Sequence, residues 1–106
     1  MLQEEIIFQL ISYAGDAKSL AFKALEYIND KDYAKAEEIM DNSKKELTKA
    51  HNLQTELLQK EAIGENSQVS LLMVHAQDHL MTAMLAKDLI EKIIFLQKEI
   101  NELKNK

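Results

Sequence analysis

The sequence is almost free of residues that break helices. It contains no proline and only two glycines, Gly15 and Gly64, among 106 residues. In a helix interior proline costs about 3 kcal/mol and glycine about 1 kcal/mol relative to alanine, so a chain that avoids both can form very long helices. The length is that of one domain, which we take to span residues 1–106. The sequence therefore predicts a single all-α domain.

Apolar residues recur at intervals of three and four in three successive segments. This spacing places them on one face of a helix. We predict three helices, at about residues 4–29, 33–63 and 68–103. The polar turns between them are short, and short turns make successive helices antiparallel neighbours. The expected fold is an up-down-up three-helix bundle.

The ends of these helices carry local signals. Asp32 is the expected N-cap of the second helix, and Ser67 is the expected N-cap of the third. Gly64 is expected to stop the second helix, because glycine readily adopts the left-handed conformation that ends many helices. Gly15 instead falls inside the first helix, where glycine usually permits a close approach by a neighbouring element. We therefore expect another helix to pack closely at Gly15.

Charge and composition exclude several classes of protein. The formal net charge is −5, so the chain lacks the basic surface that a nucleic-acid-binding protein needs. There is no cysteine, which excludes disulfides and thiolate chemistry. No apolar run approaches the roughly 20 residues of a membrane span, and Gln3, Glu4 and Glu5 stand where a signal peptide would be basic. We expect a soluble, acidic, cytoplasmic domain.

The third helix is too apolar to be covered by one bundle. Leu71, Val74, Asp78, Met81 and Leu85 follow a 3-4-3-4 spacing, which is the seam of a coiled coil. A second apolar stripe runs beside this seam, and further apolar residues lie on the opposite side. A helix that is apolar all round is buried all round. Two helices of the same subunit cannot cover that perimeter, so we expect self-association around the third helix.

Asp78 is the polar residue in this seam. In a symmetric oligomer its copies would converge on the axis, and clustered carboxylates need a proton or a cation between them. A hard cation with oxygen ligands, such as Mg²⁺, fits this requirement. The alternative is a polar residue that only sets the register and the number of subunits.

The segment VHAQDHLM, residues 74–81, gathers polar groups in this apolar helix. His75, Asp78 and His79 lie within about 100° of one face. Such a cluster can pack structurally, bind a metal, act as a general base or act as a nucleophile. A zinc site would lack an evident third ligand unless the second helix brought His51 nearby. A nucleophilic histidine is the least demanding option, because it needs only an exposed neutral nitrogen and neighbours that stabilise a charged adduct.

Three segments resemble a known family. GDAKSLAFKAL (15–25), AHNLQTELLQKEA (50–62) and VSLLMVHAQDHLMTAMLAKDL (69–89) are similar to the IIA component of the lactose and cellobiose/chitobiose class of the bacterial phosphoenolpyruvate-dependent sugar phosphotransferase system. The resemblance implies a homotrimer of three-helix subunits. It also implies that His75 is phosphorylated on Nε2 and that three copies of Asp78 share one axial Mg²⁺.

The same resemblance implies the partners. The phosphoryl group would come from the phosphocarrier protein HPr and pass to a cysteine of the IIB component, which phosphorylates a β-disaccharide entering through the membrane component IIC. His79 is then placed to hydrogen-bond the phosphoryl oxygens, and Gln77 of a neighbouring subunit is a further candidate. Two other functions stay open: a non-enzymatic helical oligomerisation scaffold and a His-ligated metal-binding bundle.

Overall fold

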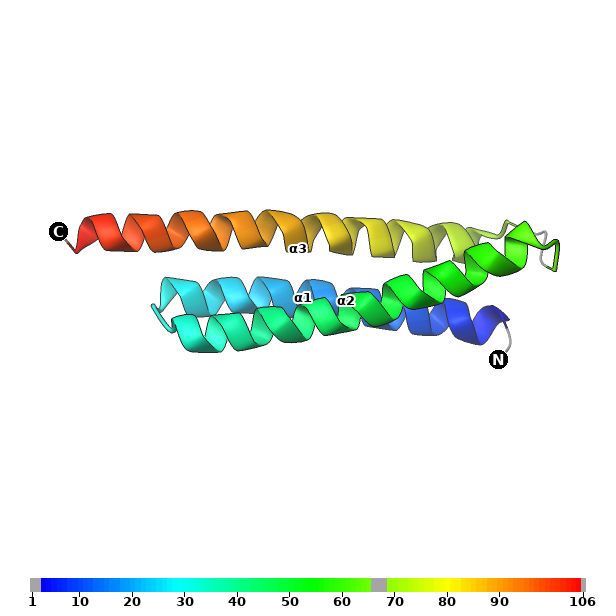
Figure 1. Ribbon diagram of the computed structural model, residues 1–106, viewed down its shortest axis with the longest axis horizontal. Coiled ribbons are helices and arrows are strands. Elements are labelled where there is room, and N and C mark those ends of the chain that lie inside the picture. The colour runs from blue at the N-terminus through cyan, green and yellow to red at the C-terminus, as the bar shows by residue number, and fades with distance from the viewer. Residues whose placement is uncertain (1–2, 66–68, 106) are drawn as a thin grey trace.

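The computed structural model describes residues 3–65 and 69–105, which form three α-helices and no strand. Helix α1 covers Gln3–Asn29, α2 covers Tyr33–Ala62 and α3 covers Leu71–Lys104. They run up, down and up in a rod of 61 × 20 × 18 Å, and the end of α3 extends past the turn between α1 and α2 (Figure 1). Helix α1 packs against both of the others, more extensively than α2 packs against α3. The predicted all-α, up-down-up bundle is confirmed.

The turn between α1 and α2 satisfies the last carbonyls of α1. The N–H of Asp32 donates to the carbonyl of Tyr27 at 2.9 Å, and that of Lys31 donates to Ile28 at 3.0 Å. This pair of bonds is a Schellman motif, which usually has glycine at its left-handed position. Here Lys31 occupies it, with φ of 62°. Asp32 caps α2 as predicted, because its Oδ1 accepts a hydrogen bond from the N–H of Lys35 at 3.3 Å.

Helix α2 ends as the sequence predicts. Gly64 has φ of 78°, a conformation that glycine adopts without a steric penalty. Its N–H donates to Glu61 at 3.1 Å, and the N–H of Glu65 donates to Lys60 at 3.0 Å. The C-termini of α1 and α2 therefore end in the same type of motif, and α2 ends at Ala62.

The predicted start of the third helix at residue 68 is wrong. Ser70 is the N-cap, because its backbone is extended and its Oγ accepts a hydrogen bond from the N–H of Met73 at 3.1 Å. The helix therefore begins at Leu71. Ser67 and Ser70 are both residues of a type that commonly caps helices. The prediction placed the start after Ser67 because the apolar Val69 also fits the helical pattern. The predicted cap at Ser67 lies outside the described residues.

The core is built around small residues of α1. Four alanines of this helix have no exposed surface, which lets α2 and α3 approach its backbone. They are Ala14, Ala17, Ala21 and Ala24. The predicted apolar face of α1 is buried or partly buried along its length, and Ile6 joins it. In α2, Leu58 is 53% exposed in the single subunit, whereas its neighbour Leu57 is buried.

A hydrogen bond rather than an apolar contact joins the middle of α1 and α2. Ser43 is fully buried, and its Oγ donates to the carbonyl oxygen of Ala17 at 2.6 Å. A buried hydroxyl is stable only when it is hydrogen-bonded, and this one uses a lone pair that the helix leaves free. The contact fixes the register of α2 against α1.

Polar pairs join α2 to α3. Glu91 of α3 lies between Lys87, at 3.3 Å, and Lys44 of α2, at 3.6 Å. Nearer the C-terminus the buried Asn101 donates to the hydroxyl of Tyr33 at 2.8 Å. These contacts hold the later part of α3 alongside the first half of α2.

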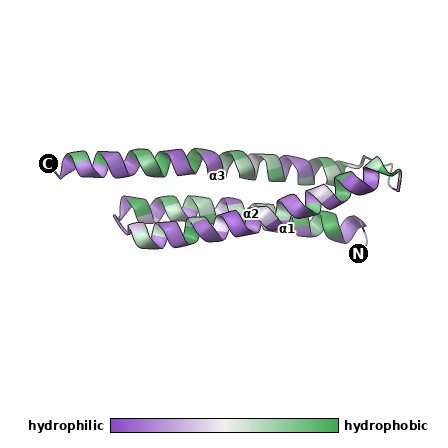
Figure 2. Ribbon diagram, in the orientation of Figure 1, coloured by the Kyte–Doolittle hydropathy of each residue, from purple (hydrophilic) through white to green (hydrophobic). Residues whose placement is uncertain are grey.

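One complete face of α3 is apolar and uncovered in the single subunit. Apolar residues recur along the whole helix (Figure 2). Those turned toward α1 and α2, such as Ala76, Leu80 and Ala83, are buried. The opposite face, which we call the outer seam, carries nine large side chains that are 44–85% exposed. These nine are Leu71, Val74, Met81, Leu85, Leu89, Ile93, Leu96, Ile100 and Leu103. Asp78 also lies on the outer seam, between Val74 and Met81.

The outer seam matches the predicted seam and extends it. The predicted residues from Leu71 to Leu85 lie on it, including Asp78, which is exposed. Beyond Leu85 the seam continues through Leu89 and Ile93, the latter 44% exposed, at a spacing of four, because an α-helix drifts relative to a strict seven-residue repeat. The expectation that two helices leave part of α3 uncovered is confirmed. No described helix combines the length and apolarity that a membrane span requires.

Candidate functional site

His75 and His79 lie against one another on α3. The centroids of their rings are 5.1 Å apart and the ring planes are tilted by 40°. His75 is exposed at the edge of the outer seam, whereas His79 is partly buried and its ring reaches toward α1. This geometry follows from the i, i+4 spacing, which stacks side chains one above the other on a helix. The structure thus brings together the two predicted histidines, with the outer one accessible to a partner.

The ring of His79 lies over Gly15 of α1. A Cβ atom at position 15 would lie 3.5 Å from Nε2 and 3.9 Å from Cδ2 of this imidazole. Both are ordinary contact distances, so the group that lies over Gly15 is a side chain of α3, and the close packing of another helix that was expected there is not found. His79 is therefore held between α1 on one side and His75 on the other.

Asp78 lies on the outer seam, three residues after His75 and exposed in the subunit. In the described part of the chain, no three His, Cys, Asp or Glu side chains gather in a way that could hold a metal ion. His51 is exposed on α2, where it lines a hollow with Met84 and Lys87. Among the described residues of the subunit, neither a histidine-ligated site nor a carboxylate site is complete.

Gln77 points away from the two histidines, toward α2. Its Oε1 accepts a hydrogen bond from Nε2 of Gln54 at 2.6 Å, and the pair is partly buried. Within the subunit this amide therefore joins α3 to α2 and lies off the face of His75. Gln54 was missed by the sequence analysis, because no signal distinguishes it from other polar residues at the edge of an apolar stripe.

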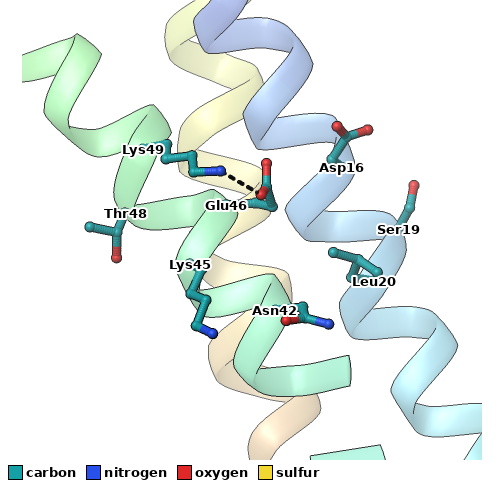
Figure 3. A pocket seen from close by; sticks show the side chains of 8 residues that line it. All are labelled: Asp16, Ser19, Leu20, Asn42, Lys45, Glu46, Thr48 and Lys49. Carbon is teal, nitrogen blue, oxygen red and sulfur yellow. Dashed lines mark hydrogen bonds and ion pairs between the residues drawn. The ribbon is translucent and has the colours of Figure 1, made fainter. Parts of the chain in front are cut away.

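A wide groove between α1 and α2 lies away from these residues. Its volume is about 810 Å³, and it contains neither histidine of α3 (Figure 3). On its α2 side Glu46 accepts a hydrogen bond from Lys49 at 3.0 Å, which raises the pKa of that lysine. Small molecules generally bind in concave, mostly apolar pockets. His75 is not among the residues that line this groove, and its exposed ring is accessible to a macromolecular partner that brings its reacting group to the surface.

The sequence places the chain in a class of sugar phosphotransferase components. Residues 5–98 match the family described as the lactose/cellobiose-specific IIA subunit of the phosphotransferase system, and the chain belongs to this family. Members of this family are phosphotransferase proteins of the sugar phosphotransferase system. The phosphotransferase activity that the resemblance implied is therefore confirmed for this chain.

Curated relatives agree with this assignment. The chain is 46% identical over 99 residues to the lichenan-specific phosphotransferase enzyme IIA component of Bacillus subtilis, covering 93% of this chain and 90% of the relative. It is 44% identical over 97 residues to the N,N'-diacetylchitobiose-specific EIIA component of Escherichia coli, covering 92% and 84%. A lactose-specific EIIA component of Staphylococcus epidermidis is 42% identical over 92 residues, covering 87% and 88%.

Solved structures confirm the fold. The cellobiose-specific enzyme IIA of Bacillus anthracis superposes with a TM-score of 0.90 at 43% identity, covering 96% of this chain and 94% of that chain. The IIA(chitobiose) chain in the IIA–HPr complex of Escherichia coli gives a TM-score of 0.84 at 42% identity, covering 95% and 98%. The three-helix subunit is thus the fold of this family.

Proposed function

We propose that His75 carries the phosphoryl group. One observation supports it above all: among the three histidines of the chain, His75 is exposed and also has a second imidazole beside it, at 5.1 Å. His51 is exposed but lies elsewhere on α2, and His79 is partly buried behind His75. An accessible, neutral imidazole nitrogen is the group that a phosphocarrier needs.

The donor is the phosphocarrier protein HPr. A relative that is 42% identical to this chain forms a IIA–HPr complex, and the shallow surface around His75 suits such a partner. Nε2 of His75 attacks the phosphorus of phospho-HPr, and the P–N bond to the donor breaks as the new P–N bond forms. In the second transfer the thiolate of a IIB cysteine attacks, so that a P–S bond replaces the P–N bond. This chain has no cysteine and supplies only the imidazole.

His79 supports the phosphorylated His75. The phosphoryl group brings negative charge and strong acceptor oxygens. Because transfer depends mostly on positioning and on stabilising charge, a neighbouring ring that donates a hydrogen bond accelerates it. Gln77 of a neighbouring subunit is a further contributor, since only its Oε1 is engaged by Gln54 and its amide group keeps its donors.

The protein assembles as a homotrimer through the outer seam. An exposed apolar surface of this extent usually marks an interface, and its spacing is that of a coiled coil. On a three-fold axis the copies of Asp78 converge, and their oxygen ligands suit one Mg²⁺ per trimer. Such an ion would neutralise the repulsion among the carboxylates. The incomplete site of the single subunit agrees with this arrangement.

The transported sugar is a β-disaccharide. The related components are specific for lichenan, N,N'-diacetylchitobiose and lactose, and a structural neighbour is specific for cellobiose. The protein acts in the cytoplasm, where it receives the phosphoryl group and passes it through IIB to the sugar that enters through IIC.

Phosphoryl labelling tests the assignment of His75. The protein is mixed with the general phosphotransferase enzymes and phosphoenolpyruvate labelled with ³²P. We expect acid-labile label on the wild type and on the control His51→Ala, and none on His75→Ala. Label on His75→Ala at the wild-type level would show that another residue carries the group. Failure of the wild type to become labelled would favour a helical scaffold without activity.

A further inference from the structure

Gly15 has no backbone reason to be glycine. It lies in the interior of α1, and among the described residues the only glycine with a positive φ is Gly64. Ordinary helical backbone is less stable with glycine than with alanine. The chain otherwise uses almost no glycine. The choice of residue at position 15 must therefore come from its surroundings.

Close packing of the helices does not explain it either. Ala14 and Ala17, on either side of Gly15, have no exposed surface, so α1 accommodates alanine where it packs against its neighbours. A Cβ at position 15 would meet atoms of one side chain within 4 Å, the ring of His79, at 3.5 and 3.9 Å. Those are ordinary contact distances rather than a clash. The missing methyl group therefore affects a single neighbour, and above all its Nε2.

The effect of a methyl group on that nitrogen is chemical. None of the hydrogen bonds among the described residues involves the imidazole of His79, so water or a phosphoryl oxygen must serve its two nitrogens. A methyl group in contact with Nε2 would occupy the space of such a partner. The two ring nitrogens are coupled, since the hydrogen bond made by one decides which of them carries the proton. Blocking Nε2 therefore also changes what the rest of the ring can donate.

We propose that Gly15 is a positioning residue for phosphoryl transfer. Its bare backbone keeps Nε2 of His79 open to a hydrogen bond that any larger residue would block, and so keeps that ring able to support phosphorylated His75. The inference rests on the proposed role of His75. It explains why the chain accepts a less stable residue within α1: the helix gives up stability at a position that lies against the supporting imidazole.

The experiment compares Gly15→Ala with Ser12→Ala. Ser12 is exposed on the same helix, so its replacement by alanine tests the effect of improved helix propensity. We expect Gly15→Ala to melt about 4 °C higher than the wild type, because alanine favours the helix. In single-turnover transfer from phospho-HPr its maximal rate should fall about tenfold, the usual effect of losing a hydrogen bond to a charged group. The KM for phospho-HPr should stay unchanged, and Ser12→Ala should transfer at the wild-type rate.

Two further measurements separate positioning from a general structural effect. The ¹⁵N resonance of His79 Nε2 should shift in Gly15→Ala and not in Ser12→Ala. In a His79→Gln background, Gly15→Ala should have no additional effect on the rate. A wild-type rate in Gly15→Ala, or an equal loss in the His79→Gln background, would overturn the inference while leaving His75 as the phosphorylated residue. Label on His75→Ala would instead refute the proposed function.

Discussion

The ring of His79 lies between Gly15 of α1 and the exposed ring of His75, whose centroid is 5.1 Å from its own. An imidazole in this position is fixed from one side by a helix backbone and is free on the other side to serve a neighbour. The ring of His79 is partly buried, so the surrounding side chains restrict its rotamers. The two histidines of one helix turn therefore have different roles, one exposed to the partner and one held in place behind it.

Replacing His79 should slow the transfer without removing the phosphorylated residue. We expect His79→Ala to be labelled on His75 but to accept the phosphoryl group about 10–100-fold more slowly, the range expected for losing one hydrogen bond to a charged group. Rapid-quench measurement with ³²P-labelled phospho-HPr checks this rate. Glu102→Ala, a change in an exposed residue near the far end of α3, serves as the control. A His79→Ala protein as fast as that control would exclude any supporting role for the ring.

The fold was largely predictable because the strongest signals in this chain are local. The absence of proline and the apolar spacing identify three helices, and Asp32 and Gly64 mark their ends through hydrogen bonds within a few residues. Ser70 was missed because it competes with another serine, and the choice depends on how the chain crosses from α2 to α3. Ser43 was also missed, since its bond to Ala17 joins residues 26 apart in sequence.

The candidate site was predictable only in part. His75, Asp78 and His79 share one helix, so helical geometry alone relates them. The contact of His79 with Gly15 depends on the packing of two helices and on the direction of one ring, which periodicity does not specify. The pairing of Gln77 with Gln54 is of the same kind. Contacts across elements were therefore the part that sequence reasoning missed.

Ser43 should stabilise the pairing of α1 and α2. Ser43→Ala removes the bond to the carbonyl of Ala17, and we expect a loss of about 1 kcal/mol in the free energy of unfolding. The carbonyl of Ala17 keeps its helical partner, so the loss should not be larger. Urea denaturation followed by circular dichroism measures it. Ser19→Ala, at an exposed position of α1, is the matched control and should change stability little.

Replacing Lys31 with glycine should stabilise the protein. Its φ of 62° places the Cβ atom in an unfavourable position, whereas glycine adopts this conformation freely. We expect Lys31→Gly to raise the free energy of unfolding by about 1 kcal/mol. The control is Lys31→Ala, which removes the charge but keeps the Cβ atom. If both variants gained equally in thermal denaturation, the gain would come from the charge and the backbone explanation would be wrong.

The outer seam should decide the number of subunits. Leu85 is 59% exposed in the single subunit and lies on this seam, so a trimer would bury it. We expect Leu85→Lys to dissociate the assembly into monomers that keep their helical signal, because a buried unpaired charge is very unfavourable. Analytical ultracentrifugation measures the mass of the particle. Phe8→Lys, which places the same charge on an exposed apolar residue of α1, should leave the mass unchanged. Monomeric wild-type protein would contradict the trimer.

Asp78 should destabilise the trimer when no cation is present. Three carboxylates that meet on an apolar axis repel one another, and a leucine at this position would continue the outer seam. We therefore expect Asp78→Leu to melt at a higher temperature than the wild type in the presence of EDTA. Addition of Mg²⁺ should raise the melting temperature of the wild type and leave that of the variant unchanged. Glu102→Leu, an exposed acid-to-leucine change about 100° around α3 from Leu103, controls for the gain in hydrophobicity. Dissociation of Asp78→Leu into subunits, or an equal response of both proteins to Mg²⁺, would place Asp78 away from the axis.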